Sequence, residues 1–221
     1  MNTSRDCHTT NNNHAKFRGR NVPYYSQWES HSLIQAIIQR TATAMDDVLW
    51  AQSGAPDLKT YAEWSGHLCG IACLRMILAA YEIPPPPAFS LAMRAKKFGA
   101  YVEAPDGIKG LIYQPFIEML KADYGITGRT FVHKSVEDLK TLKSQNDFVI
   151  TSVHHTIRSP HYNPPSKGGH LVLIHDQSAR GEFIFHNPSG DTPESQQNAV
   201  VQSYDFERFF AGRGITIQME N

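Results

Sequence analysis

Three polar residues stand where a nucleophile, a base and an orienting amide would be needed. Cys69 opens the apolar stretch CGIACLRMIL, His170 opens the run HLVLIH, and Asn187 follows the run EFIFH. A cysteine thiolate is a strong nucleophile, and a histidine titrates in the range needed to take and return its proton. An amide oxygen can accept the second ring N–H of that histidine and hold its orientation. The order Cys, His, Asn therefore indicates nucleophilic acyl transfer at a carbonyl carbon.

The cysteine is expected in the first turn of a buried helix. Apolar residues recur at helical spacing over 68–82, and four consecutive prolines at 84–87 end the pattern. Unpaired N–H groups and the positive end of the helix dipole favour a thiolate at such a place. Cys69 is therefore the candidate nucleophile, with the alternative that it is only a small buried residue. Cys73, one turn further on, is predicted to pack in the core.

His170 is the candidate base among eleven histidines. It begins a predicted strand directly after Gly168 and Gly169, and a strand holds a side chain more rigidly than a loop does. The alternative is an ordinary core histidine. His154 and His155 are adjacent, so their rings point to different sides of a strand, and the sequence has neither a Cys-x-x-Cys nor a His-Glu-x-x-His motif. We therefore predict no metal site and no cofactor.

The composition excludes several classes of protein. The 221 residues are 41% hydrophobic and 19% charged, as in a globular protein, and Lys plus Arg equal Asp plus Glu at 21 each. This balance gives no extended basic surface for nucleic acid, and no apolar run is long enough to span a membrane. The polar start lacks the apolar segment of a signal peptide, and three cysteines do not make a disulfide framework. We therefore predict a reducing, cytoplasmic location.

The order of elements indicates one domain of the α+β class. Residues 1–20 are polar and rich in asparagine and are predicted to form a disordered tail, followed by a single domain over 21–221. The first half favours helices, and the second half favours short strands, so we expect a helical N-terminal part packed on an antiparallel β-sheet. Helices are predicted at 31–52 (one or two), 68–82, 88–98, 110–124 and after a cap at Ser135, and strands near 131–132 and at 147–153, 170–175, 182–186 and 214–219.

Five segments resemble the peptidase C39-like group of papain-superfamily cysteine peptidases. They are VPYYSQ at 22–27, CGIACLRMIL at 69–78, GGHLVLIHD at 168–176, HNPSG at 186–190 and FERFFAGRGITI at 206–217. The resemblance spans almost the whole domain. It implies a papain-like fold and the roles given above to Cys69, His170 and Asn187, with Asn187 standing where many relatives have Asp.

The resemblance also implies that the Gln27 side chain supplies half of an oxyanion hole, beside the backbone N–H of Cys69. Two features differ from the family pattern. Ile71 stands where proline is commonest, and the stretch between Gln27 and Cys69 is longer than relatives usually have. The extra segment, at about 28–68, is predicted to be a helical insertion that acts as a lid or selects substrates. If this segment displaces Gln27, Gln52 is the candidate replacement.

Three functions are compatible with this pattern. The first is a cysteine peptidase or amidase, in which water resolves a thioester formed from a peptide or amide substrate. The second is an acyltransferase with the same three residues, in which an amine or thiol takes the place of water. The third is a non-catalytic binding module that keeps the fold. A complete Cys, His and Asn set argues against the third, because a binder has no need of all three.

Overall fold

A six-stranded antiparallel sheet forms the centre of the molecule. The computed structural model describes residues 21–219, so the predicted disordered tail at 1–20 lies outside the described residues. The strand order is β3-β8-β4-β5-β6-β7. The strands are β3 (Ile126–Phe131), β4 (Phe148–Val153), β5 (His170–Gln177), β6 (Phe183–His186), β7 (Ala199–Val201) and β8 (Phe210–Met219). All neighbouring pairs run antiparallel, as predicted.

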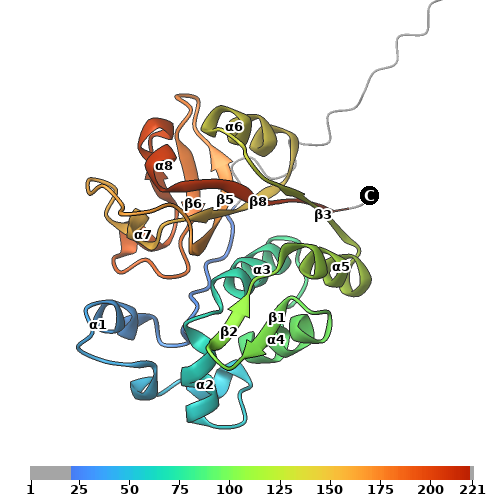
Figure 1. The fold of residues 1–221 in the computed structure, drawn as a ribbon, viewed down its shortest axis with the longest axis vertical. Coiled ribbons are helices and arrows are strands. Elements are labelled where there is room, and N and C mark those ends of the chain that lie inside the picture. Colours follow the sequence, from blue (N-terminus) through green and yellow to red (C-terminus); the bar gives the residue numbers. More distant parts are fainter. Residues whose placement is uncertain (1–20, 220–221) are drawn as a thin grey trace, which may run out of the picture.

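Both faces of the sheet are covered by helices because successive side chains of the central strands point to opposite faces. In β5, Leu171 and Leu173 belong to the apolar cluster shared with the N-terminal helices, whereas Val172 and Ile174 belong to the cluster on the other face. The first face carries α3 (Cys69–Ala80), α4 (Ala88–Lys97) and α5 (Tyr113–Tyr124), and the second carries α6 (Val136–Gln145) and α8 (Ser203–Phe209) (Figure 1). The predicted α+β class is confirmed.

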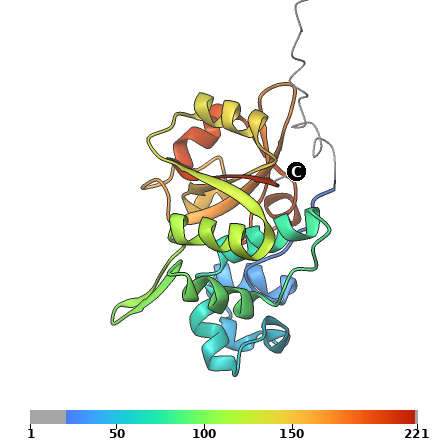
Figure 2. The ribbon, with the colours of Figure 1, turned by 90° about the vertical axis from the view of Figure 1, so that its right-hand side faces the viewer.

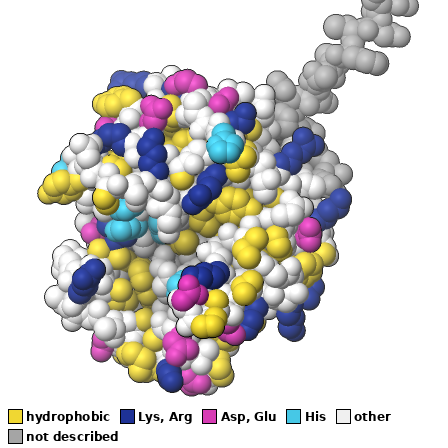
Figure 3. Space-filling view, viewed as in Figure 1, with side chains coloured by type: hydrophobic (Ala, Val, Ile, Leu, Met, Phe, Trp, Pro, Cys, Tyr) yellow, Lys and Arg dark blue, Asp and Glu magenta, His cyan; other side chains and the backbone are white. Residues whose placement is uncertain are grey.

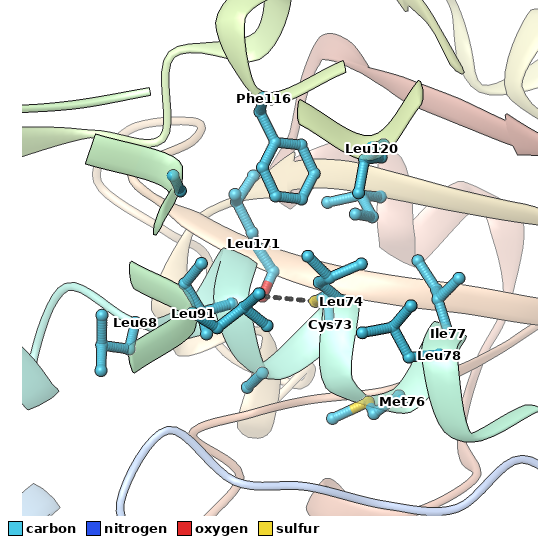
Figure 4. Packing of buried hydrophobic residues seen from close by; sticks show 14 of the residues in the cluster. Leu68, Cys73, Leu74, Met76, Ile77, Leu78, Leu91, Phe116, Leu120 and Leu171 are labelled. Carbon is cyan, nitrogen blue, oxygen red and sulfur yellow. Dashed lines mark hydrogen bonds between the residues drawn. The ribbon is translucent and has the colours of Figure 1, made fainter. Parts of the chain in front are cut away.

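Helix α3 connects the site to the core. It is apolar on nearly every side, and it begins after Leu68 without a capping side chain, so its first N–H groups are not satisfied by a side chain. Cys73 is fully buried and its Sγ lies 4.0 Å from the carbonyl oxygen of Leu171 in β5 (Figure 4). The prediction that Cys73 packs in the core is therefore confirmed. At Gly70, an added Cβ would lie 2.9 Å from a Leu111 methyl, so this glycine allows close packing.

The segment 28–68 contains only short helical elements, so the prediction of one or two amphipathic helices over 31–52 is correct at its start and wrong beyond Ile38. Its elements are the 3₁₀ turns His31–Leu33, Ala44–Asp46 and Trp50–Ser53, with α1 (Ile34–Ile38) and α2 (Leu58–Ser65). Asp47 is the physical reason, because its buried carboxylate accepts hydrogen bonds from the backbone N–H groups of Glu29, Ser30 and Leu49, and from the hydroxyl of Tyr61. Backbone that turns around a carboxylate cannot continue as a helix.

A hairpin and several short elements were also missed. Strands β1 (Tyr101–Ala104) and β2 (Gly107–Gly110) form an antiparallel hairpin that projects from the body (Figure 2). Helix α5 therefore begins at Tyr113 and not at 110. The strand β7 and the helices α7 (Pro193–Gln196) and α8 have too few residues to show a periodic pattern. Within residues 21–219, no helix has the length and the apolar content that a membrane span requires.

Replacing Asp47 by alanine should destabilise the fold. Hydrogen bonds from Ser30 and Tyr61 hold the pKa of Asp47 below its usual value, although burial alone would raise it. Asp47→Ala leaves several buried donors without an acceptor, so we expect a loss of about 2–4 kcal/mol in the free energy of unfolding. Asp46→Ala removes an exposed cap in the same segment and should cost about 1 kcal/mol or less. Urea denaturation checks both variants, and equal losses would contradict this account.

Candidate active site

The ends of two neighbouring strands bring His170 and Asn187 together. In the pairing of β5 with β6, Leu173 lies opposite His186. Three residues further along each chain, the same register places His170 across from Ser189. The ring Nε2 of His170 lies 2.8 Å from Asn187 Oδ1 and 3.2 Å from Ser189 Oγ. Asn187 is completely buried, and His170 is 6% exposed. Sequence reasoning paired these two residues, and the structure joins them by a hydrogen bond.

The neighbours of Asn187 determine which nitrogen of His170 carries the proton. The backbone N–H of Ser189 donates to Asn187 Oδ1 over 3.1 Å. A backbone N–H can only donate, so the side-chain oxygen, and not the amide nitrogen, must face both Ser189 and His170. Nε2 of His170 is therefore the donor to Asn187, and Nδ1 carries the lone pair. A neutral imidazole with a free Nδ1 can act as a base.

Cys69 and His170 line the same pocket. The pocket has a volume of about 320 Å³ and is lined by Cys69, Gly110, Leu111, Tyr113, Ser152, Gly169, His170, Leu171 and Arg213. None of these residues comes from the segment 28–68. Figure 3 shows the face seen in Figure 1, where hydrophobic side chains gather between basic ones over the middle of the molecule. The two residues predicted to exchange a proton thus share one small cavity.

A larger hollow lies elsewhere and lacks this chemistry. It has a volume of about 1000 Å³ and lies between α5, β3 and α6. Its lining has lysine, arginine, threonine and amide side chains but no cysteine, histidine or carboxylate. Acyl transfer needs a nucleophile with a base beside it, so the smaller pocket is the candidate active site.

Burial favours the neutral form of both reacting groups. Burial raises the pKa of the Cys69 thiol, and the backbone N–H groups of Leu171, Gly70 and Cys69 itself oppose this. Burial also lowers the pKa of His170 to about 4, although the hydrogen bond to Asn187 raises it. The unliganded site therefore holds a thiol and a neutral imidazole at neutral pH. The proton passes to the imidazole when the thiol reacts.

Arg158 and Ser189 extend the network behind His170, and sequence reasoning missed both. Arg158 Nη2 donates to Ser189 Oγ over 3.1 Å, and Ser189 Oγ in turn contacts His170 Nε2. The positive charge of Arg158 lowers the pKa of His170 further, after burial. Ser189 lies inside the HNPSG segment, so its nearness to Asn187 could have been noticed. Arg158 ends the 3₁₀ turn His155–Arg158 between β4 and β5, and nothing in the sequence indicates where it points.

The N-terminal extended segment packs against the turn that carries Asn187. The backbone N–H of Gln27 donates to Pro188 O over 3.0 Å, and the Tyr24 hydroxyl donates to Asn187 O over 3.0 Å. His186 Nε2 donates to Val22 O over 2.8 Å. These contacts join residues more than 150 positions apart. They fix the backbone from which the Asn187 amide reaches His170.

Gln27 is buried next to the helix that precedes Cys69. Its Nε2 lies 3.3 Å from Ser65 O and 3.4 Å from Gly66 O, at the end of α2. Gln27 is not among the residues that line the pocket. The alternative, Gln52, is exposed on the 3₁₀ turn Trp50–Ser53 and does not line the pocket either.

Comparisons with known proteins identify a family. A model of the Peptidase_C39 like family matches residues 20–213. A solved double glycine motif protease from an AMS/PCAT transporter, in complex with the leader peptide, is 18% identical with a TM-score of 0.42, over 69% of this chain and 84% of that chain. The peptidase domain of Streptococcus ComA, a bifunctional ABC transporter in a quorum-sensing pathway, is 16% identical with a TM-score of 0.47, over 70% of this chain and 93% of that chain. No curated protein shows significant similarity.

The alkylation rate of Cys69 should depend on pH as that of a thiol with a raised pKa does. The pKa of the thiol is raised and that of His170 is lowered to about 4, so between about pH 5 and 7 both groups stay neutral and little thiolate exists. We expect the rate with iodoacetamide to rise steadily above neutral pH. Mass spectrometry of the labelled peptides, with Cys73 as internal reference, measures it. A plateau between pH 4 and 7 would reveal a thiolate–imidazolium pair and contradict this prediction.

Proposed function

Because this chain belongs to the Peptidase_C39 like family, we propose that it is a cysteine peptidase or amidase that cleaves a peptide or amide bond with Cys69, His170 and Asn187. The hydrogen bond from His170 Nε2 to Asn187 Oδ1 carries this proposal. It directs the unprotonated Nδ1 away from Asn187, and the ring lines the pocket that Cys69 also lines. A base beside a nucleophile in a pocket is the arrangement that acyl transfer needs.

The first half of the reaction forms a thioester. Nδ1 of His170 takes the thiol proton as the sulfur of Cys69 bonds to the substrate carbonyl carbon. The carbonyl oxygen becomes an oxyanion. The C–N bond then breaks, and the leaving amine takes the proton from the imidazolium. Asn187 keeps the ring in one orientation through both transfers, because its oxygen accepts the Nε2 hydrogen throughout.

The second half releases the acyl group. Water gives a proton to the same imidazole nitrogen and attacks the thioester carbon, and the thiol leaves with that proton. An amine or thiol acceptor in place of water would give acyl transfer through the same intermediate. The three residues serve both reactions equally, so the acceptor has to be identified from the products.

The oxyanion is assigned to two N–H donors. The first is the backbone N–H of Cys69, at the start of a helix that no side chain caps. The second is the amide of Gln27. Nε2 of Gln27 carries two hydrogens, and its two carbonyl contacts, Ser65 O and Gly66 O, belong to adjacent residues. One hydrogen shared between these carbonyls leaves the other for the substrate. Gln52 lacks comparable support because its side chain is exposed.

Removing the thiol should abolish turnover, and removing the neighbouring thiol should not. We expect Cys69→Ala to lose at least about 10⁴-fold in rate, because the covalent path is gone. Cys73→Ala, one turn further along α3, should keep the activity. A pool of synthetic peptides with product masses read by mass spectrometry measures both, and an added amine separates hydrolysis from transfer. Acylation of Cys69 by p-nitrophenyl acetate traps the thioester, and equal acylation of Cys69 and Cys73 would overturn the proposal.

The role of Gln27 can be tested by replacing it and measuring whether kcat or KM changes. We expect Gln27→Ala to lower kcat by roughly 10²–10³-fold with little change in KM, because an oxyanion donor acts only in the transition state. Gln52→Ala is the matched control and should leave both constants unchanged. Thermal denaturation is measured in parallel. A loss of rate that disappears at lower temperature, where the variant is fully folded, would make Gln27 a structural residue only.

A further inference from the structure

The candidate pocket has one positive charge and no negative charge in its lining. Arg213 borders it together with the hydroxyl groups of Tyr113 and Ser152, and none of the nine lining residues is Asp or Glu. Within residues 21–219, no carboxylate forms an ion pair with Arg213. An exposed cation beside a nucleophile, with no carboxylate paired to it among these residues, is available to a ligand of opposite charge.

A bulge in the sheet directs Arg213 to this place. Strands β4 and β8 pair with Thr151 opposite Gly214 and then with Val153 opposite Phe210, so residues 211–213 oppose Ser152 alone. A bulge of this kind interrupts the ladder and turns side chains away from their regular direction. Gly212 has φ of +68°, a conformation that favours glycine, and its carbonyl accepts the Lys134 N–H over 3.0 Å.

Gly168 lets the chain pass close to these groups, and Gly169 leaves open space next to it. Gly168 has φ of +90°, and an added Cβ would lie 3.1 Å from Ser152 Oγ and 3.2 Å from Arg213 Nη2. Both polar atoms therefore border the volume that a side chain at position 168 would fill. Gly169 leads into His170, and nothing lies within 4 Å of a Cβ added there. Two donors thus lie close to the glycine turn that leads into the candidate base, and they line the same pocket as that base.

The hydroxyl of Tyr113 adds a third donor. Burial raises the pKa of Tyr113, and Arg213 and Ser152 oppose this only in part. The phenol therefore stays protonated at neutral pH and can donate to an anion. A guanidinium with two hydroxyl groups suits a carboxylate, which accepts several hydrogen bonds at once.

We propose that Arg213, Tyr113 and Ser152 form a subsite for a carboxylate next to the bond that is cleaved. This inference rests on the proposed function, because it concerns the substrate of Cys69. It defines the substrate class as peptides with either an acidic side chain or a free C-terminal carboxylate near the scissile bond. Both sources present the same chemistry to the subsite. Positive charge at this position discriminates against peptides with Lys or Arg there.

Two alkylating reagents of similar size test the subsite without any need for a known substrate. Iodoacetate carries a carboxylate, and iodoacetamide is its neutral counterpart. We expect Arg213→Gln to lower the ratio of the two Cys69 labelling rates, iodoacetate over iodoacetamide, roughly tenfold, as the loss of one charge-assisted hydrogen bond would. Arg213→Lys should retain most of the ratio. Arg180→Gln changes an exposed arginine in the turn between β5 and β6 and should leave the ratio unchanged.

The outcomes separate this inference from the proposed function. Rapid iodoacetamide labelling of Cys69 with the same ratio in wild type and Arg213→Gln overturns the subsite and leaves the peptidase proposal intact. No labelling of Cys69 above that of Cys73 by either reagent overturns both.

Matched peptides then distinguish the two sources of the carboxylate. Faster cleavage of a peptide with Asp than of the same peptide with Asn identifies the side chain as the source. Faster cleavage of a peptide with a free C-terminal acid than of its amide identifies the terminus. In either case Arg213→Gln should remove the preference. Equal cleavage within both pairs overturns the inference.

Discussion

The hydrogen bond between His170 and Asn187 is the constraint on which the rest of the site depends. It exists because β5 and β6 are antiparallel neighbours whose register brings the start of one strand to the end of the other. The Asn187 oxygen is held by the Ser189 N–H, and its backbone by contacts from the N-terminal segment. The imidazole thereby keeps one tautomer and one orientation. A base fixed in this way does not have to reorient when it takes a proton, so the transfer carries no free-energy cost of reorganisation.

Burial and a nearby positive charge together determine the protonation states in this site. Burial makes charge costly on both the thiol and the imidazole, so the unliganded pair is neutral. Arg158 behind the ring adds to this effect on the histidine. In the reaction we propose, the balance changes when a substrate carbonyl accepts the negative charge, because the charge then moves from sulfur to an oxygen with its own donors. The proposed mechanism therefore places charge on these groups during the reaction and not in the resting site.

Elements with a long periodic pattern were predicted well, and the short ones were not. The run CGIACLRMIL has enough apolar residues to define α3, and the runs that became β4 and β5 are apolar because helices bury both faces of the sheet. The segment 28–68 also has apolar residues near helical spacing. There, however, the buried carboxylate of Asp47 gathers backbone N–H groups and overrides the pattern. Such a tertiary interaction leaves no periodic signal in the sequence.

The sequence by itself determined which residue types were available for acyl transfer and the order in which they occur. Cys69, His170 and Asn187 each stand at the boundary of an element with a clear local signal. Only the tertiary structure decided what surrounds them. Arg158 comes from a short 3₁₀ turn and Arg213 from a bulge. The position of Arg158 depends on its contact with the distant Ser189, and that of Arg213 on the pairing of β4 with β8 and on the neighbouring glycines. Local propensity acts over a few residues, whereas the charge around a site is set by groups that the fold brings together from far apart.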